Sequence, residues 1–232
     1  MGIRQFRYSA DNLGYLVYGS KTAVAIDGGA VHAILDYVEK HNLELTYVTN
    51  THRHPDHTAG TGDLVKLSGA TYLPRAMLLD AGQIVLDDIK VAVIDTPGHT
   101  DDSISFSVGD SLITGDTLFN GTVGNCFSDD LKSFYESIKK LLAFPVSTRV
   151  YAGHDYVKYS MAFAKIVEPE NAQIDAFLQA YDPALIVSTL ADELEVNPYV
   201  RFNAEPIIAL LKKRGFPVET EYERWLGVMS LE

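Results

Sequence analysis

Residues 50–60 read NTHRHPDHTAG, a stretch that places His52, His54, Asp56 and His57 within six residues. It comes directly after LELTYV, an apolar run that predicts a buried strand. A strand fixes the direction of the side chains that follow it, so the loop at a strand end is where polar groups can be held for chemistry. We therefore expect a sheet whose edge gathers this loop with other polar side chains.

Three later motifs also place a histidine or an aspartate just after a predicted strand. His99 follows DTPG, Asp116 follows ITG and His154 follows VYAG, and each is a predicted strand end with a glycine-containing turn. Five of the seven histidines thus come just after a strand, and His32 and His41 are the exceptions. Any one of them alone would fit a surface or capping role, but their shared position favours one common site.

The residue types in these loops indicate metal chemistry. His52 and His54 are two apart in an extended segment, so they point to the same side and can share one ion. Nitrogen and carboxylate ligands without sulfur favour Zn, Fe or Mn over a structural zinc cage. The candidates divide into His52, His54 and His99 for one metal and Asp56, His57 and His154 for the other, with Asp116 between them. Seven ligands for two ions leave positions free for water, which is typical of a catalytic site.

Periodicity gives the coarse plan of the chain. Strands are predicted within 14–28, 43–48, 71–74, 83–95, 103–114 and 148–153. Helices are predicted at 31–42, 58–70, 130–144, 161–181, 204–215 and 220–229. The chain is therefore predicted to be α+β, with a β-rich body over residues 1–160 and a helical C-terminal extension over residues 161–232.

Composition excludes several classes of protein. The net charge of −12 repels phosphate backbones, so nucleic acid is not an expected partner. No stretch approaches the ~20 apolar residues of a membrane span, and the N-terminus lacks the apolar run of a signal peptide, so a cytoplasmic location is expected. Cys126 is the only cysteine, which excludes an intrachain disulfide and a thiolate metal cage. We expect Cys126 to pack as a small hydrophobe.

The motifs resemble a known superfamily. THRHPDH matches the T-H-x-H-x-D-H signature of the metallo-β-lactamase fold, and DTPGHT, TGDTLF and AGHDY stand where its later ligand motifs stand, in the same order over residues 10–160. The resemblance implies an αββα sandwich with the metals at one edge. GDTLF, GHDY, KIVEPENAQI and EVNPYVRF are most similar to the glyoxalase II type, which hydrolyses S-acylglutathione thioesters. Asp27, in IDGG, matches a position that supports the metal-binding loop without being a ligand.

This resemblance implies a dinuclear hydrolase that cleaves thioesters such as S-(2-hydroxyacyl)glutathione with a metal-bound hydroxide. The two divalent ions would be zinc, or else iron or manganese. Asp56 and Asp116 are the expected catalytic residues, Asp116 as the bridge and Asp56 mainly as a ligand. The expected substrate-binding residues are Tyr156, Arg201 and Asn125, and the resemblance implies that the helical C-terminal extension contributes to the substrate pocket. Tyr156 and Arg201 match substrate-contact positions, whereas Asn125 and Phe127 stand where the family has a lysine and a tyrosine that hold glutathione. The glutathione-binding set is therefore partial.

Other functions fit the same motifs in part. A persulfide dioxygenase would use a single iron held by His52 or His54, His99 and Asp116, but its Cys-Gly-Arg-Thr-Asp segment is missing here. A lactonase or a phosphodiesterase could use the same fold, because function lies in the site. A non-enzymatic scaffold would be expected to show broken ligand motifs, and all of them are intact.

Overall fold

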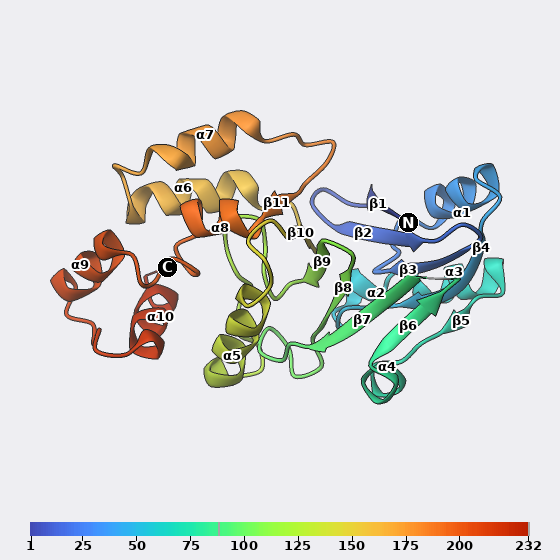
Figure 1. Ribbon diagram of the computed structural model, residues 1–232, viewed down its shortest axis with the longest axis horizontal. Helices are drawn as coiled ribbons and strands as arrows, with labels where there is room; N and C mark the ends of the chain where they lie inside the picture. The colour runs from blue at the N-terminus through green and yellow to red at the C-terminus, as the bar shows by residue number, and fades with distance from the viewer. Residues whose placement is uncertain (88, 232) are drawn as a thin grey trace.

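Two β-sheets pack face to face in the computed structural model, which describes residues 1–87 and 89–231. The first sheet has the strand order β1 (Gly2–Arg7), β2 (Leu13–Tyr18), β3 (Thr22–Ile26), β4 (Glu44–Thr49), β5 (Thr71–Tyr72). The second has the order β11 (Ser188–Thr189), β10 (Arg149–Ala152), β9 (Ser111–Gly115), β8 (Ile104–Val108), β7 (Ile89–Asp95), β6 (Gln83–Leu86). Helices cover the outer sides (Figure 1). The predicted α+β class and the αββα order are confirmed.

Strand β2 shows how the sequence builds these layers. Successive side chains of a strand point to opposite faces of the sheet. Tyr15 accordingly faces the core between the sheets with Phe106 of β8. Leu16 faces the other way, against Ile34 of α1 (Val31–Lys40) and Leu64 of α3 (Thr61–Ser68). One strand therefore contributes to two separate cores.

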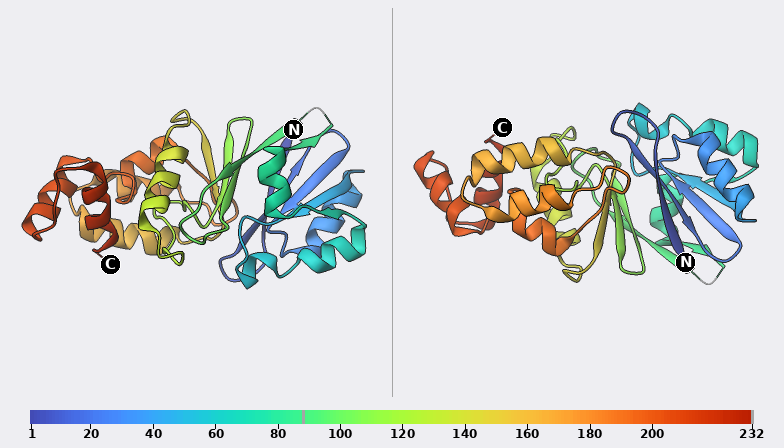
Figure 2. Two further views of the ribbon diagram at one scale, coloured as in Figure 1. Left: turned by 90° about the horizontal axis from the view of Figure 1, so that it is seen from below. Right: turned by 90° about the horizontal axis from the view of Figure 1, so that it is seen from above.

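The helix α5 (Leu131–Leu142) and the C-terminal helices pack beside the second sheet (Figure 1). The C-terminal helices are α6 (Val157–Val167), α7 (Ala172–Ala180), α8 (Leu190–Val196), α9 (Glu205–Lys213) and α10 (Glu221–Met229). Trp225 of α10 is fully buried and packs edge-on against Phe134 of α5, with ring centroids 5.8 Å apart. Figure 2 shows α9 and α10 at the end of the molecule opposite to α1.

The C-terminal helices share their core with the second sheet, and β11 extends that sheet beside β10. The predicted boundary at residue 160 falls inside α6, and a division into two domains stays a prediction. The helical segment predicted over 161–181 is divided into α6 and α7. Pro169 disfavours a helical backbone at the preceding residue, and Glu168 has left the helix with φ −130° and ψ 72°. The helix α4 (Arg75–Ala81) and the strand β1 were not predicted.

Strand direction brings four loops to one edge of the sandwich. β9 and β10 run parallel, and β7 has the same direction because two antiparallel pairings separate it from β9. In the first sheet, β3 and β4 run parallel. His52 follows β4, His99 follows β7, Asp116 follows β9 and His154 follows β10. Ligand sites commonly lie outside the carboxyl ends of such strands.

Among the described residues, no helix is both long enough and apolar enough to cross a bilayer.

Candidate metal centre

The seven predicted ligands lie together at this edge. Their ligand atoms form two groups, and within each group all of them lie within 4.8 Å of one another. The first group is His52, His54, His99 and Asp116, and the second is Asp56, His57 and His154. Asp116 also reaches the second group, since its Oδ1 lies 3.2 Å from His57 Nε2 and its Oδ2 lies 3.4 Å from His154 Nε2. The structure thus brings the residues together in the groups that the sequence suggested, with Asp116 between them.

Several histidine nitrogens of each group face one another at short distances. His54 Nδ1 lies 2.9 Å from His52 Nε2 and 3.1 Å from His99 Nε2. In the second group, His57 Nε2 lies 3.2 Å from His154 Nε2. Lone pairs that face a common point are the arrangement in which imidazoles bind a cation.

Asp27 holds the ligand loop from behind. Its carboxylate is buried and accepts hydrogen bonds from the Thr51 amide at 2.8 Å and from the Thr51 hydroxyl at 2.7 Å. His57 Nδ1 lies 2.9 Å from the same carboxylate. Because an ionised carboxylate can only accept, His57 donates through Nδ1 and its Nε2 is left to act as a ligand. Asp27 has a backbone φ of 52°, a conformation that Asp tolerates better than most residues.

Other contacts orient the remaining ligands. His99 Nδ1 lies 2.9 Å from the Asn125 carbonyl oxygen, to which it can only donate, so its Nε2 faces the centre. Asp56 is held by Asn12, whose Nδ2 donates to its carboxylate at 2.8 Å, and by Tyr8, whose hydroxyl donates to its carbonyl at 2.9 Å. Asn12 and Tyr8 were missed by the sequence analysis. They come from the turn before β2, 44 and 48 residues away from Asp56, and no local motif marks them.

The electrostatics of the centre favour bound cations. Burial raises the pKa of Asp116, but the neighbouring His154 and His57 rings outweigh this and hold it well below its usual range. Burial lowers the pKa of His57, but the Asp27 and Asp116 carboxylates outweigh it and raise that pKa to about 11. Burial, with the adjacent His57, lowers the pKa of His52 to about 4. The ionised carboxylates and the neutral His52 can bind a metal as they are, whereas His57, with its raised pKa, would release the proton on Nε2 to bind an ion.

One buried atom tests this fit directly. Asp116 Oδ1 makes no hydrogen bond, although the Asp116 side chain is almost fully buried. A buried carboxylate oxygen without a hydrogen bond is costly, and a cation between it and His57 Nε2, 3.2 Å away, would compensate for that cost. The residues of the centre therefore fit two metal ions, one for each group.

A cavity of about 830 Å³ opens beside the two groups. Its lining includes Tyr156 and Asn125, both predicted to contact the substrate. The Tyr156 ring is stacked on His154, with centroids 4.9 Å apart and an angle of 5° between the planes. Phe127 lies at the same cavity, edge-on to His54 and His99. A substrate bound here would lie against both metal groups.

Arg201 is the predicted contact that the structure does not bring to this cavity. Its Nε and Nη2 donate to the two carboxylate oxygens of Glu168 at 2.8 and 2.9 Å, and its Nη1 donates to the Leu194 carbonyl at 2.6 Å. The Glu168 side chain is only 3% exposed, and a carboxylate buried to that degree needs a cation. Arg201 therefore joins the end of α6 to α8 instead of lining the cavity.

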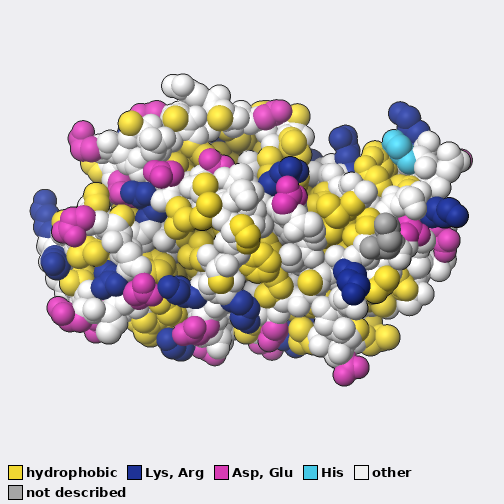
Figure 3. Space-filling model, in the orientation of Figure 1, with side chains coloured by type: hydrophobic (Ala, Val, Ile, Leu, Met, Phe, Trp, Pro, Cys, Tyr) yellow, Lys and Arg dark blue, Asp and Glu magenta, His cyan; other side chains and the backbone are white. Residues whose placement is uncertain are grey.

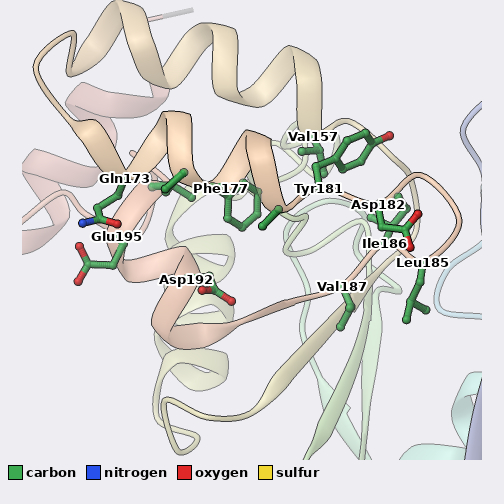
Figure 4. A pocket seen from close by; sticks show the side chains of 13 residues that line it. Val157, Gln173, Phe177, Tyr181, Asp182, Leu185, Ile186, Val187, Asp192 and Glu195 are labelled. Carbon is green, nitrogen blue, oxygen red and sulfur yellow. The ribbon is translucent and has the colours of Figure 1, made fainter.

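A second cavity, of about 400 Å³, lies between α7, α8 and the segment before β11 (Figure 4). Apolar side chains such as Phe177 and Ile186 form much of its wall, and Asp182, Asp192 and Glu195 also line it. None of the seven clustered ligands lines this cavity. The chemistry of the molecule therefore lies at the first cavity.

Comparison with known proteins agrees with this geometry. The chain matches the family model described as the metallo-beta-lactamase superfamily over residues 13–84 and 73–154, and that of the hydroxyacylglutathione hydrolase C-terminus over residues 155–222. It is 32% identical to a hydroxyacylglutathione hydrolase of Pseudoalteromonas translucida, over 90% of this chain and 88% of the relative. It is 31% identical to that of Idiomarina loihiensis, over 86% and 85%. Among solved structures, ETHE1 from Myxococcus xanthus aligns with a TM-score of 0.70 and 25% identity, over 100% of this chain and 91% of the other.

Proposed function

Because this chain belongs to the metallo-beta-lactamase superfamily and is similar to hydroxyacylglutathione hydrolases over most of its length, we propose that it hydrolyses thioesters with two metal ions. One observation carries the proposal: the seven ligands form two complete groups with Asp116 between them. The names of the relatives make S-(2-hydroxyacyl)glutathione the first substrate to assay.

Each residue of the centre has a part in this reaction. His52, His54 and His99 would hold one ion, Asp56, His57 and His154 the other, and Asp116 both. When bound, these ions would supply a water of lowered pKa as the nucleophile and positive charge for the carbonyl oxygen of the substrate. Asp27 fixes the His57 ring, and Asn12 fixes the Asp56 carboxylate, so the ligands are ordered before an ion arrives.

The leaving group places little further demand on the protein. A thiolate leaves readily, since thiols have a pKa of about 8.5 in water, far below that of an alcohol. A general acid beside the sulfur is therefore dispensable. Asp56, whose side chain is 45% exposed, then acts mainly as a ligand.

The second metal group separates this proposal from the persulfide dioxygenase, which needs one iron and only His52 or His54, His99 and Asp116. The test is elemental analysis of the metal-loaded protein, together with assays on S-lactoylglutathione and on glutathione persulfide. We expect two ions per chain and hydrolysis of the thioester. One iron per chain, with oxygen uptake on the persulfide and no thioester hydrolysis, would replace the proposal with the dioxygenase.

A further inference from the structure

The cavity beside the two metal groups, here called the metal-side cavity, has an apolar and largely aromatic wall that adjoins the ligands. This wall is formed by Phe119, Val123, Phe127, Tyr156 and Tyr159. Phe127 is 62% exposed and Tyr159 is 69% exposed. Two large aromatic side chains exposed at the mouth of a concave site offer apolar surface that a ligand can cover.

Cations are missing from the same lining. Among the described residues, neither lysine nor arginine lines the cavity, whereas the carboxylates of Asp56 and Asp116 do. Asn125 stands at the mouth with an exposed, neutral side chain. The electrostatic character of the cavity without ions is therefore negative around the ligands and neutral along the wall.

Two arginines near the metal ligands or at the C-terminal helices are held by acidic partners. Arg53, next to the ligand His54, binds Asp101 and Asp102, and Arg201 binds Glu168. On the face drawn in Figure 3, Lys and Arg side chains lie interspersed with Asp and Glu over the C-terminal helices. Drawing Arg53 or Arg201 to a substrate carboxylate would break an existing ion pair.

Glutathione carries two carboxylates, and these would have to be placed in this cavity without a cation of the protein. The reacting carbonyl must lie at the metal groups, and a 2-hydroxyacyl group is small. The larger, thiol-derived part of the substrate therefore occupies the rest of the cavity and meets the aromatic wall. An uncharged, apolar thiol would cover that wall, whereas an anionic one would lose hydration without gaining an ion pair.

We infer that this site, if it is the thioester hydrolase proposed above, selects thioesters whose thiol-derived part is uncharged and apolar. Phe127 and Tyr159 then bind the thiol part, and the neutral side chain at Asn125 keeps that end of the cavity free of positive charge.

Three substrates with the same lactoyl group test the inference on the full, metal-loaded chain. They are S-lactoylglutathione, its diethyl ester, in which both carboxylates are esterified, and the lactoyl thioester of phenylmethanethiol. We expect kcat/KM to be at least ~10-fold higher for the diester than for the free diacid, and the benzyl thioester to be as good as the diester or better, mainly through KM. The diester removes both negative charges and keeps the α-ammonium group of the tripeptide, whereas the benzyl thioester carries no charge.

Variants at the wall provide a second measurement. Asn125→Lys should narrow the preference for the diester over the diacid at least ~3-fold, because it adds a cation at an exposed position. Phe127→Ala should lower the preference for the benzyl thioester over the diacid by ~5- to 10-fold. Tyr72→Ala, which removes an aromatic ring that is 43% exposed and is not among the residues lining the cavity, is the matched control and should leave both preferences unchanged.

The outcomes separate this inference from the proposed function. A preference for the diacid over the diester would overturn the inference while leaving the thioester hydrolase in place. Unchanged preferences in both wall variants would also overturn it. Hydrolysis of none of the three thioesters by protein that holds two ions would overturn both.

Discussion

Glu193 on α8 gives a prediction that does not depend on the metal centre. Its side chain is fully buried, and its carboxylate accepts hydrogen bonds from Ser188 Oγ at 2.6 Å, Asn197 Nδ2 at 2.8 Å and the Gly121 amide at 2.9 Å. None of these partners is charged. Burial raises the pKa of Glu193 to about 7, because the three hydrogen bonds offset only part of the cost of removing the charge from water.

The size of the effect follows from this pKa. It rises from an ordinary value of 4.5 to about 7 on folding, and at ~1.36 kcal/mol for each pH unit this amounts to roughly 3 kcal/mol. Between these two pH values the folded chain keeps a proton that the unfolded chain has lost. The free energy of unfolding therefore falls as the pH rises from about 4.5 to about 7, and this contribution is constant above that range.

Glu193→Gln removes this pH dependence. The amide has the shape of the protonated carboxyl: its oxygen can accept from Gly121 and Asn197, and its NH₂ can donate to the Ser188 hydroxyl. We expect the variant and the wild type to have similar stability at pH 5. At pH 8 the variant should be more stable by up to about 3 kcal/mol, because it no longer buries a charge.

Equilibrium urea unfolding at pH 5 and pH 8, with the same metal loading, measures both differences. Glu195→Gln is the control, since it removes an exposed carboxylate from the same helix and should change stability little at either pH. An equal effect of Glu193→Gln on the free energy of unfolding at both pH values would contradict a buried, titrating carboxyl at Glu193. Titration of the metal ligands affects the wild type and the two variants equally, so it cancels when their free energies of unfolding are compared at one pH.

Three further predictions concern the centre and its surroundings. Asp116→Asn should lower kcat at least ~100-fold with little change in the melting temperature, and near-wild-type turnover would contradict its place between the two groups. Asp27→Asn should weaken metal binding by ~10- to 100-fold in a chelator competition, because His57 and its loop lose a charged acceptor, and an unchanged affinity would contradict that role. Arg201→Ala should lower the free energy of unfolding by about 3 kcal/mol, since Glu168 would be left buried without its cation, while KM stays within ~2-fold. A raised KM at unchanged stability would instead place Arg201 at the substrate.

The sequence by itself determined the elements that depend on local order along the chain. Apolar periodicity marked most of the strands and helices, and the strand-end motifs put His52, His99, Asp116 and His154 at what became one edge. These features can be predicted because the backbone fixes the direction of a side chain. This holds for a ligand that lies two residues from another ligand and for one that lies just past a strand. The order of the motifs was enough to indicate the fold.

Only the tertiary structure decided which partner each remaining side chain finds. Arg201 matched a substrate-contact position, yet it binds Glu168, 33 residues away, because a carboxylate buried there needs a cation. Asn12 reaches Asp56 across 44 residues, and the aromatic wall combines Phe119 and Phe127 with Tyr156 and Tyr159 of a different segment. Such pairings depend on how the sheets and helices pack against one another, and the sequence around one residue carries no information about the partner that packing will bring to it.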